Sequence, residues 1–311
     1  MPTEKTFNRF SKNSLLGFGI ISLLFWSWFI LLIGVTAAEF YFFLMMAILF
    51  FTNKVTRQIF VVFSPFFIYL TFYSSLRALH KVNPFPVHLE DLYALELKYF
   101  GFMYKGERVI LNEYFLENLN TFSDLFSGAF YITSVPLPIL FAFICIYRKK
   151  SRIAFNFWLC FLIANLFGFV GYILYPAAPP WYFLEYGNEL LLTAKGSAAG
   201  LARFDEILGI SMYKTMYSQG TNTFGAMPSM HAAFPLILVY YSLKFKNKWL
   251  TMLFLLSLVG IWYGAIYTAH HYILDIVMGI VCGILGLIIT ELYVNRKFVA
   301  KWYSNAIAFI G

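Results

Sequence analysis

Long runs of apolar residues alternate with short polar clusters along most of the chain. A helix needs roughly 17 to 25 residues to cross the hydrocarbon core of a bilayer. Runs close to that length extend over about residues 15–35, 38–52, 59–76, 128–147, 153–174, 228–243, 249–268 and 271–291. The pattern predicts eight transmembrane helices, with the second and sixth short. The first run lacks the cleavage site of a signal peptide, so we expect it to be retained. The expected fold is an all-α polytopic membrane helix bundle.

The charged residues between the runs predict the orientation of the spans, because Lys and Arg in short loops stay on the cytoplasmic side. With eight spans, the inner side receives 15 of the 23 basic residues and 2 of the 15 acidic ones. Both termini are then cytoplasmic. The inner basic residues form five clusters: Lys5, Arg9 and Lys12; Lys54 and Arg57; Arg148, Lys149, Lys150 and Arg152; Lys244, Lys246 and Lys248; Arg296, Lys297 and Lys301.

Two long segments on the outer side, about 77–127 and 175–227, mix acidic, aromatic and turn residues. Leu89–Phe100 has apolar residues at near-helical spacing, as in a helix lying in the membrane interface, and a second such stretch runs through Asn112–Phe126. These segments either cap the bundle or contact lipid directly, and the sequence favours neither. With no repeat or linker, we expect 1–311 to form a single membrane-embedded domain.

The composition excludes a soluble globular enzyme, because 60% of the residues are apolar and only 12% are charged. The net charge of +8 does not indicate nucleic-acid binding, since the basic residues lie in short clusters between apolar runs. Cys145, Cys160 and Cys282 all lie inside apolar runs. They indicate apolar packing, not a disulfide framework or a zinc site.

All five histidines fall on the predicted outer side: His80, His88, His231, His270 and His271. His271 and Asp275 are four residues apart at the start of the eighth run, which places them on one helix face. A carboxylate inside a membrane helix is costly without a partner, and an imidazole N–H can supply one. Such a pair either orients a nucleophile, as in catalytic triads, or only tightens helix packing.

Two further motifs lie at the outer ends of other spans. His231 lies in GAMPSMHAAF (Gly225–Phe234), where the sixth span begins. YPAAPPWY (Tyr175–Tyr182) ends the fifth span, and its prolines force a rigid non-helical exit. Three segments far apart in sequence therefore reach the same membrane face, which favours a site there.

In this order and spacing the motifs resemble the type 2 phosphatidic acid phosphatase superfamily. PSMH (Pro228–His231) and HHYILD (His270–Asp275) are similar to its last two motifs. Together with YPAAPPWY they resemble the inositol phosphorylceramide synthase branch, the inositolphosphotransferases. The resemblance covers about residues 161–280. It implies that 128–292 is the catalytic helix core, and that 1–127 adds N-terminal spans and the outer interfacial segment.

The resemblance also implies roles for individual residues. His271 would attack phosphorus to form a phosphohistidine, and Asp275 would orient it. His231 would protonate the leaving alkoxide and then act as base for the incoming alcohol. Ser229 would donate a hydrogen bond to a phosphate oxygen. Further motif residues would line the substrate site: His270, Tyr175, Pro179, Pro180, Trp181, Tyr182 and Thr268. No metal or other cofactor is implied.

The chain departs from the superfamily's phosphatases, whose Lys-x6-Arg-Pro and Ser-Arg motifs clamp a phosphate with cations. Those registers hold Gly168, Tyr175 and Pro176, and then Gly264 and Ala265. A phosphomonoester carries nearly two negative charges and a phosphodiester one, so losing the cations favours a diester substrate. The outer loop contains basic residues that could replace the charge, unless it is a solvated connection: Lys195, Arg203 and Lys214.

The leading hypothesis is a transferase that moves a phosphoalcohol, foremost phosphoinositol, from a glycerophospholipid to the hydroxyl of ceramide or a similar lipid. The alternative enzyme is a phosphatase acting on lipid phosphates or polyprenyl pyrophosphates. A transporter fits less well, because the charged residues lie at one face instead of the midplane. We expect a site on the periplasmic or lumenal face, foremost of a bacterial inner membrane, with the donor and acceptor lipids as partners.

Overall fold

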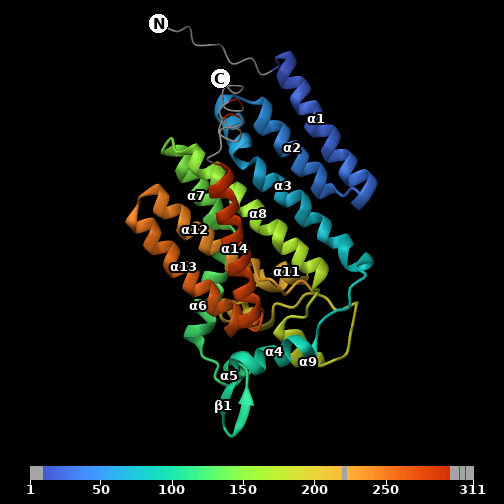
Figure 1. The fold of residues 1–311 in the computed structure, drawn as a ribbon, viewed down its shortest axis with the longest axis vertical. Helices are drawn as coiled ribbons and strands as arrows, with labels where there is room; N and C mark the ends of the chain where they lie inside the picture. Colours follow the sequence, from blue (N-terminus) through green and yellow to red (C-terminus); the bar gives the residue numbers. More distant parts are fainter. Residues whose placement is uncertain (1–9, 219–222, 295–300, 302–304, 306–311) are drawn as a thin grey trace.

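The computed structural model describes residues 10–218, 223–294, 301 and 305, and this part of the chain is almost entirely helical (Figure 1). Five of its helices are long and apolar enough to cross a membrane, or six if one bent helix pair counts as a span. The protein is therefore an integral membrane protein. The five are α1 (Lys12–Trp28) with its π-helical extension Phe29–Ile33, α3 (Lys54–Val82), α8 (Ser151–Leu174), α13 (Lys248–Tyr267) and α14 (Ile273–Val294).

Three of the eight predicted spans are not single helices of spanning length. The second run forms α2 (Ala37–Phe51) and the sixth forms α12 (Met230–Phe245), of 15 and 16 residues. The fourth is split into α6 (Thr121–Tyr131), a 3-10 turn (Ile132–Ser134) and α7 (Pro136–Tyr147), with a bend of 49°. Pro136 begins α7, and proline has no amide hydrogen to continue the preceding ladder. All eight runs are helical, but eight complete crossings are not shown.

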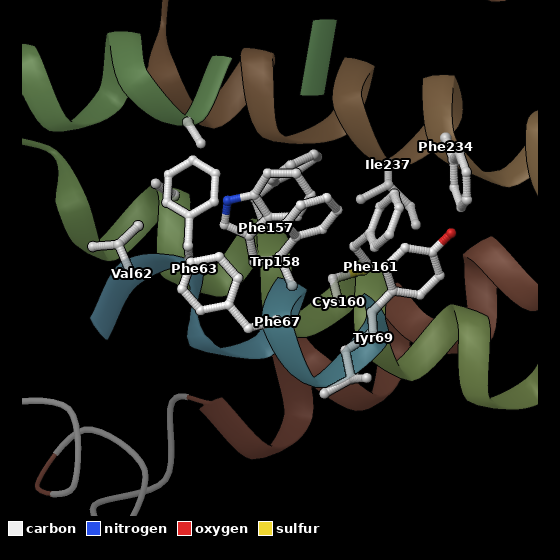
Figure 2. Packing of buried hydrophobic residues seen from close by; sticks show 14 of the residues in the cluster. Val62, Phe63, Phe67, Tyr69, Phe157, Trp158, Cys160, Phe161, Phe234 and Ile237 are labelled. Carbon is white, nitrogen blue, oxygen red and sulfur yellow. The ribbon is translucent and has the colours of Figure 1, made fainter. Parts of the chain in front are cut away.

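The core of the bundle is built around α8, which packs against α3, α12 and α14. Figure 2 shows aromatic side chains of α3 and α8 interdigitating, with α12 adding Phe234 and Ile237. Phe234 stacks on Phe161 at 4.2 Å between ring centroids, and Trp158 is fully buried. All three cysteines are buried and unpaired, which confirms their prediction as apolar filling.

The N-terminal helices α1, α2 and α3 form a layer beside this core (Figure 1). Their contacts are mainly between aromatic rings: Phe18 packs against Phe50 and Phe60, and Phe25 against Phe43. A buried guanidinium, that of Arg57, donates hydrogen bonds to the Phe50 carbonyl and the Ser14 hydroxyl. Apolar packing thus holds most of this layer, and polar contacts such as the hydrogen bond from the Trp28 indole to the Ser75 hydroxyl add to it.

Short elements cover one end of the bundle, the lower end in Figure 1. They are α4 (Glu90–Phe100), strands β1 (Phe102–Tyr104) and β2 (Glu107–Val109), α5 (Leu111–Glu117), α9 (Pro180–Tyr186), a 3-10 turn (Ala199–Leu201), α10 (Ala202–Leu208) and α11 (Met212–Ser218). Helix α4 confirms the helix predicted at Leu89–Phe100. The second predicted stretch is divided between α5 and α6.

The sequence interpretation missed the hairpin β1–β2. Its two-residue turn, Lys105 and Gly106, has positive φ at both positions, which a glycine accommodates readily. Helix α1 begins, and α14 ends, at the opposite end of the bundle from the hairpin (Figure 1).

Candidate active site

Segments far apart in sequence are joined by backbone hydrogen bonds at the hairpin end. The amide of Ala177 donates to the Phe224 carbonyl at 2.8 Å, and the Ala226 amide donates back to Ala177 at 3.2 Å. On the other side, the His88 amide donates to the Pro176 carbonyl at 2.8 Å. The structure thus brings the YPAAPPWY and GAMPSMH motifs together. The start of the outer segment, at His88, is hydrogen-bonded to the same strand-like stretch of backbone.

The third motif enters through the turn from α13 to α14, residues 268–272, which we call the catalytic turn. Its Ala269 carbonyl accepts a hydrogen bond from the Trp181 amide at 2.9 Å, so YPAAPPWY contacts this motif too. Ala269 adopts φ of 57°, in the left-handed region that is strained for a residue with a β-carbon. The amides of His270 and His271 both donate to the Ala265 carbonyl at 3.0 Å. These bonds fold the turn tightly over the end of α13.

His271 and Asp275 are brought together, but not on one helix face as predicted: His271 lies in the catalytic turn, and α14 begins two residues later at Ile273. Nδ1 of His271 is 3.4 Å from Oδ2 of Asp275, and the carboxylate is fully buried. The same oxygen accepts a hydrogen bond from the Tyr272 amide at 2.9 Å. A fixed carboxylate beside Nδ1 favours the tautomer protonated there, which leaves a lone pair on Nε2.

His231 lies in the first turn of α12 and faces the same space. Its ring centroid is 5.8 Å from that of His271. On its other side, the hydroxyl of Tyr131 lies 3.2 Å from His231 Nδ1, and the two rings stack. Tyr131 is buried at the end of α6. The sequence interpretation missed this tyrosine, since it is an aromatic residue at the edge of an apolar run.

Close backbone packing fixes the position of α12. The Ser229 amide donates to the Asp275 carbonyl at 2.9 Å, and a β-carbon at Gly279 of α14 would overlap the Ser229 carbonyl oxygen. The Ser229 hydroxyl is buried and has no hydrogen-bond partner within the described residues. Buried polar groups are rarely left unpaired without a functional reason. This hydroxyl is a candidate substrate contact.

His270 and Thr268 lie behind the His231–His271 pair. Nδ1 of His270 is 3.0 Å from the Thr268 hydroxyl, which itself donates to the Gly264 carbonyl at 2.6 Å. Burial lowers the pKa of His270 to about 3 and the pKa of His271 to about 4. Both rings are therefore neutral near pH 7, as a nitrogen nucleophile must be.

The YPAAPPWY residues differ in how close to the surface they lie. Tyr175 is partly exposed and its ring stacks on His88 at 3.6 Å. Pro179 and Pro180 are buried where α9 begins, and Trp181 is half-buried. The Tyr182 hydroxyl donates to the Glu189 carbonyl and accepts from the Leu191 amide, so it is used within its own loop.

Two of the basic residues that could replace the cationic clamp already have acidic partners. Nε of Arg203 is 2.6 Å from Asp124, and Lys214 is 3.0 Å from Glu206. Gly168, where the phosphatase motif has a lysine, packs closely against Met230. A side chain at that position would first have to displace the flexible side chain of Met230.

Among the described residues, no group of three or more histidine, cysteine, aspartate and glutamate side chains is placed to hold a metal ion. The site comprises two histidines whose ring centroids lie 5.8 Å apart, one of them beside a buried carboxylate, at the end of a membrane helix bundle. An imidazole held beside a buried carboxylate, with a second imidazole facing it, is an arrangement suited to nucleophilic catalysis with general acid–base assistance.

The chain belongs to the PAP2 superfamily, whose model matches residues 107–289, more than half of the sequence. It is 42% identical over 246 residues to the phosphoinositol dihydroceramide synthase of Bacteroides thetaiotaomicron, covering 78% of this chain and 80% of that protein. It is 38% identical over 116 residues to the inositol phosphorylceramide synthase catalytic subunit of Saccharomyces cerevisiae, covering 37% and 29%. A Candida albicans inositol phosphorylceramide synthase is 33% identical over 151 residues, covering 47% and 30%. No solved structure matches the chain.

Proposed function

We propose that the protein transfers phosphoinositol from a glycerophospholipid such as phosphatidylinositol to the hydroxyl of ceramide, dihydroceramide or a similar lipid. The observation that carries this proposal is the facing pair His231 and His271, with Asp275 beside the second ring. The extended similarity to a bacterial phosphoinositol dihydroceramide synthase supports the choice of headgroup and acceptor.

In the first half-reaction, Nε2 of His271 attacks phosphorus. A P–N bond forms as the P–O bond to the diacylglycerol breaks, and His231, protonated at that stage, gives its proton to the leaving alkoxide. Asp275 stabilises the positive charge that develops on the His271 ring. The Ser229 hydroxyl, buried at the start of α12, donates a hydrogen bond to a non-bridging phosphate oxygen.

In the second half-reaction, His231 takes the proton of the acceptor hydroxyl, whose oxygen attacks phosphorus. The P–N bond breaks, and the ring of His271 is again neutral. Tyr131 lies 3.2 Å from Nδ1 of His231 and keeps Nε2 turned toward the phosphate throughout. A transferase must keep water from the phosphohistidine, and His271 is only 7% exposed.

The donor headgroup is a phosphodiester, which carries a single negative charge and needs fewer cations than a phosphomonoester does. Arg203 and Lys214 have carboxylate partners, so a doubly charged monoester would meet little free positive charge from them. We place the inositol and the lipid chains against Tyr175, Trp181, His270 and Thr268, with Pro179, Pro180 and Tyr182 holding the wall behind them.

The topology belongs to the same proposal. Eight crossings, with α2, α12 and the bent pair α6–α7 each counted as one, place both termini in the cytoplasm. The start of α1 and the end of α14 at one end of the bundle support this count (Figure 1). The active site then opens on the periplasmic or lumenal face, and the bacterial relative favours the periplasm.

The test is to give the detergent-solubilised protein phosphatidylinositol and a fluorescent ceramide, and to separate the products by thin-layer chromatography. We expect a new charged fluorescent lipid with the wild-type protein and none with His271→Ala. Phosphate release from phosphatidic acid or polyprenyl pyrophosphate, without a new fluorescent lipid from ceramide, would instead identify a phosphatase.

A further inference from the structure

Two buried side chains of the outer segment hold the catalytic turn from the side opposite the bundle. They are Glu96 of α4 and Asn112 of α5, and both are fully buried. Glu96 lies before the region that the family model matches, and neither residue belongs to the three motifs. Burying a carboxylate and an amide is costly, so the contacts that each makes indicate what it does.

The carboxylate of Glu96 caps α14. One oxygen accepts a hydrogen bond from the Ile273 amide at 2.9 Å, and the other accepts from the Leu274 amide at 3.1 Å. These are the first two amides of the helix, which have no partner within it. The negative charge of this carboxylate also interacts favourably with the positive end of the helix dipole. Glu96 therefore fixes where α14 begins, between His271 and Asp275.

The amide of Asn112 joins the last turn of α13 to the catalytic turn. Its Nδ2 donates to the Ile266 carbonyl at 2.9 Å and to the His271 carbonyl at 3.1 Å. The first carbonyl lies in the last turn of α13, and the second belongs to the residue that carries the nucleophilic ring. One side chain thus sets the spacing between the end of α13 and His271.

Apolar packing keeps both helices against the turn. Leu92 of α4 and Ile110, just before α5, are buried in one cluster with Tyr272 and Ala177. Tyr272 lies between His271 and the capped amide of Ile273, and it is fully buried. The outer segment therefore packs on the backbone that orients the reacting ring.

We propose that Glu96 and Asn112 are positioning residues that hold His271 in line with the phosphate, a role that rests on the proposed transfer reaction. Asn112 bonds the carbonyl of His271, and Glu96 bonds the amides two and three residues later. Loss of either contact lets the ring shift, and a misplacement of about 1 Å lowers a rate by about 100-fold. The outer segment is then part of the active site, because its contacts position His271 as well as cover the end of the bundle.

The experiment compares Glu96→Gln and Asn112→Asp with matched controls from the same segment. Gln replaces one acceptor oxygen by a donor that faces an amide, and Asp places negative charge against two carbonyls. Glu117→Gln and Asn118→Asp are the controls: Glu117 pairs only with exposed Lys105, and Asn118 donates to Tyr104 and Tyr114. The measurements are kcat, KM for phosphatidylinositol and the melting temperature in detergent.

We expect kcat to fall about 30- to 100-fold in both test variants, with KM within about twofold and the controls at the wild-type rate. If either test variant does not fold, the milder Glu96→Asp and Asn112→Ser replace it. Folded variants with the wild-type kcat, or with only a raised KM, would refute the positioning role. An inactive wild-type protein would refute the proposed function instead, so the two failures are distinguishable.

Discussion

Two regions of the molecule, the catalytic end and the N-terminal layer, are held together in different ways. The catalytic end, where α12, α13 and α14 meet the outer segment, depends on hydrogen bonds at fixed positions and on helices in backbone contact. The N-terminal layer of α1, α2 and α3 depends on aromatic rings that pack in many orientations, from stacked to edge-on. The first kind of packing specifies geometry to a fraction of an ångström. The second supplies burial and tolerates changes of shape.

The same glycine-to-alanine change should therefore have opposite outcomes in the two regions. In Gly279→Ala the new methyl overlaps the Ser229 carbonyl and pushes α12 away from α14, so we expect kcat to fall about 100-fold or more. In Gly19→Ala of α1 the methyl meets no other atom within 4 Å, so activity should be unchanged. Product formation and melting temperature, measured on both variants, check the contrast. Similar losses in both would refute it.

A smaller effect is expected when one hydrogen bond is removed at the catalytic end. Tyr131→Phe keeps the ring stacked on His231 but loses the hydroxyl near Nδ1, and we expect kcat to fall about tenfold, the value of one such bond. Tyr213→Phe is the control, because its hydroxyl donates to the Gly128 carbonyl of the same helix α6. An equal loss of rate in both variants would show that Tyr131 acts only through stability.

The pH dependence should identify the carboxylate of Glu96. Burial raises its pKa to about 7, Asp275 adds to the rise, and the amides of Ile273 and Leu274 oppose it. Protonation removes an acceptor from the start of α14, so the transfer rate should fall as the pH drops below about 7. Asp275 and Tyr272 also lie close to Glu96, and burial raises the pKa of the Tyr272 hydroxyl, so this hydroxyl does not titrate near pH 7. His271, with a pKa of about 4, would act only at lower pH.

The fall of the transfer rate below about pH 7 should be absent from Glu96→Gln.

The effect of protonating Glu96 on the stability of the fold has the opposite sign to its effect on the rate. Because the pKa is raised in the folded protein, protonated Glu96 stabilises it most below pH 4.5, and that contribution is lost as the pH rises through about 7. The difference in melting temperature between wild type and Glu96→Gln, followed with pH, measures it. If the transfer rate of Glu96→Gln still fell below about pH 7, the titrating group would be a residue other than Glu96.

The smallest effect is expected from Phe25→Leu in the N-terminal layer. Phe25 packs against Phe29, Phe42 and Phe43, and similar apolar side chains can refill that space. We expect a loss of less than about 1.5 kcal/mol in stability and no change in kcat. Phe234→Leu in α12 is the comparison, because Phe234 packs on Phe161 three residues from His231. A lower kcat should appear in that variant alone.

Local patterns in the sequence predicted the parts of the site that are local in the chain. His271 and Asp275 are four residues apart, and this short separation kept them close although His271 lies in the catalytic turn and not in α14. The contacts of Tyr131 with His231 and of Asn112 with His271 join residues 100 and 159 positions apart. No periodicity in the sequence indicates contacts between residues so far apart, so only the three-dimensional structure shows them.

The fold was predictable to a similar extent. Hydropathy found every apolar helix, because burial in lipid and burial in the bundle select the same residues. It did not show the break at Pro136, since proline and its apolar neighbours leave the run intact by composition. The hairpin was missed because its strands have only three residues each, and because Lys105–Gly106 is not one of the residue pairs that mark a two-residue hairpin turn.

The distance along the chain between the outer segment and the catalytic turn has a consequence for how the protein is made. Glu96 precedes the amides that it caps by 177 and 178 residues, and Asn112 precedes His271 by 159. A ribosome therefore completes α4 and α5 long before it reaches α14. The nascent chain cannot assemble its nucleophile until the last helix pair has been inserted, so reactive chemistry is withheld from unfinished protein.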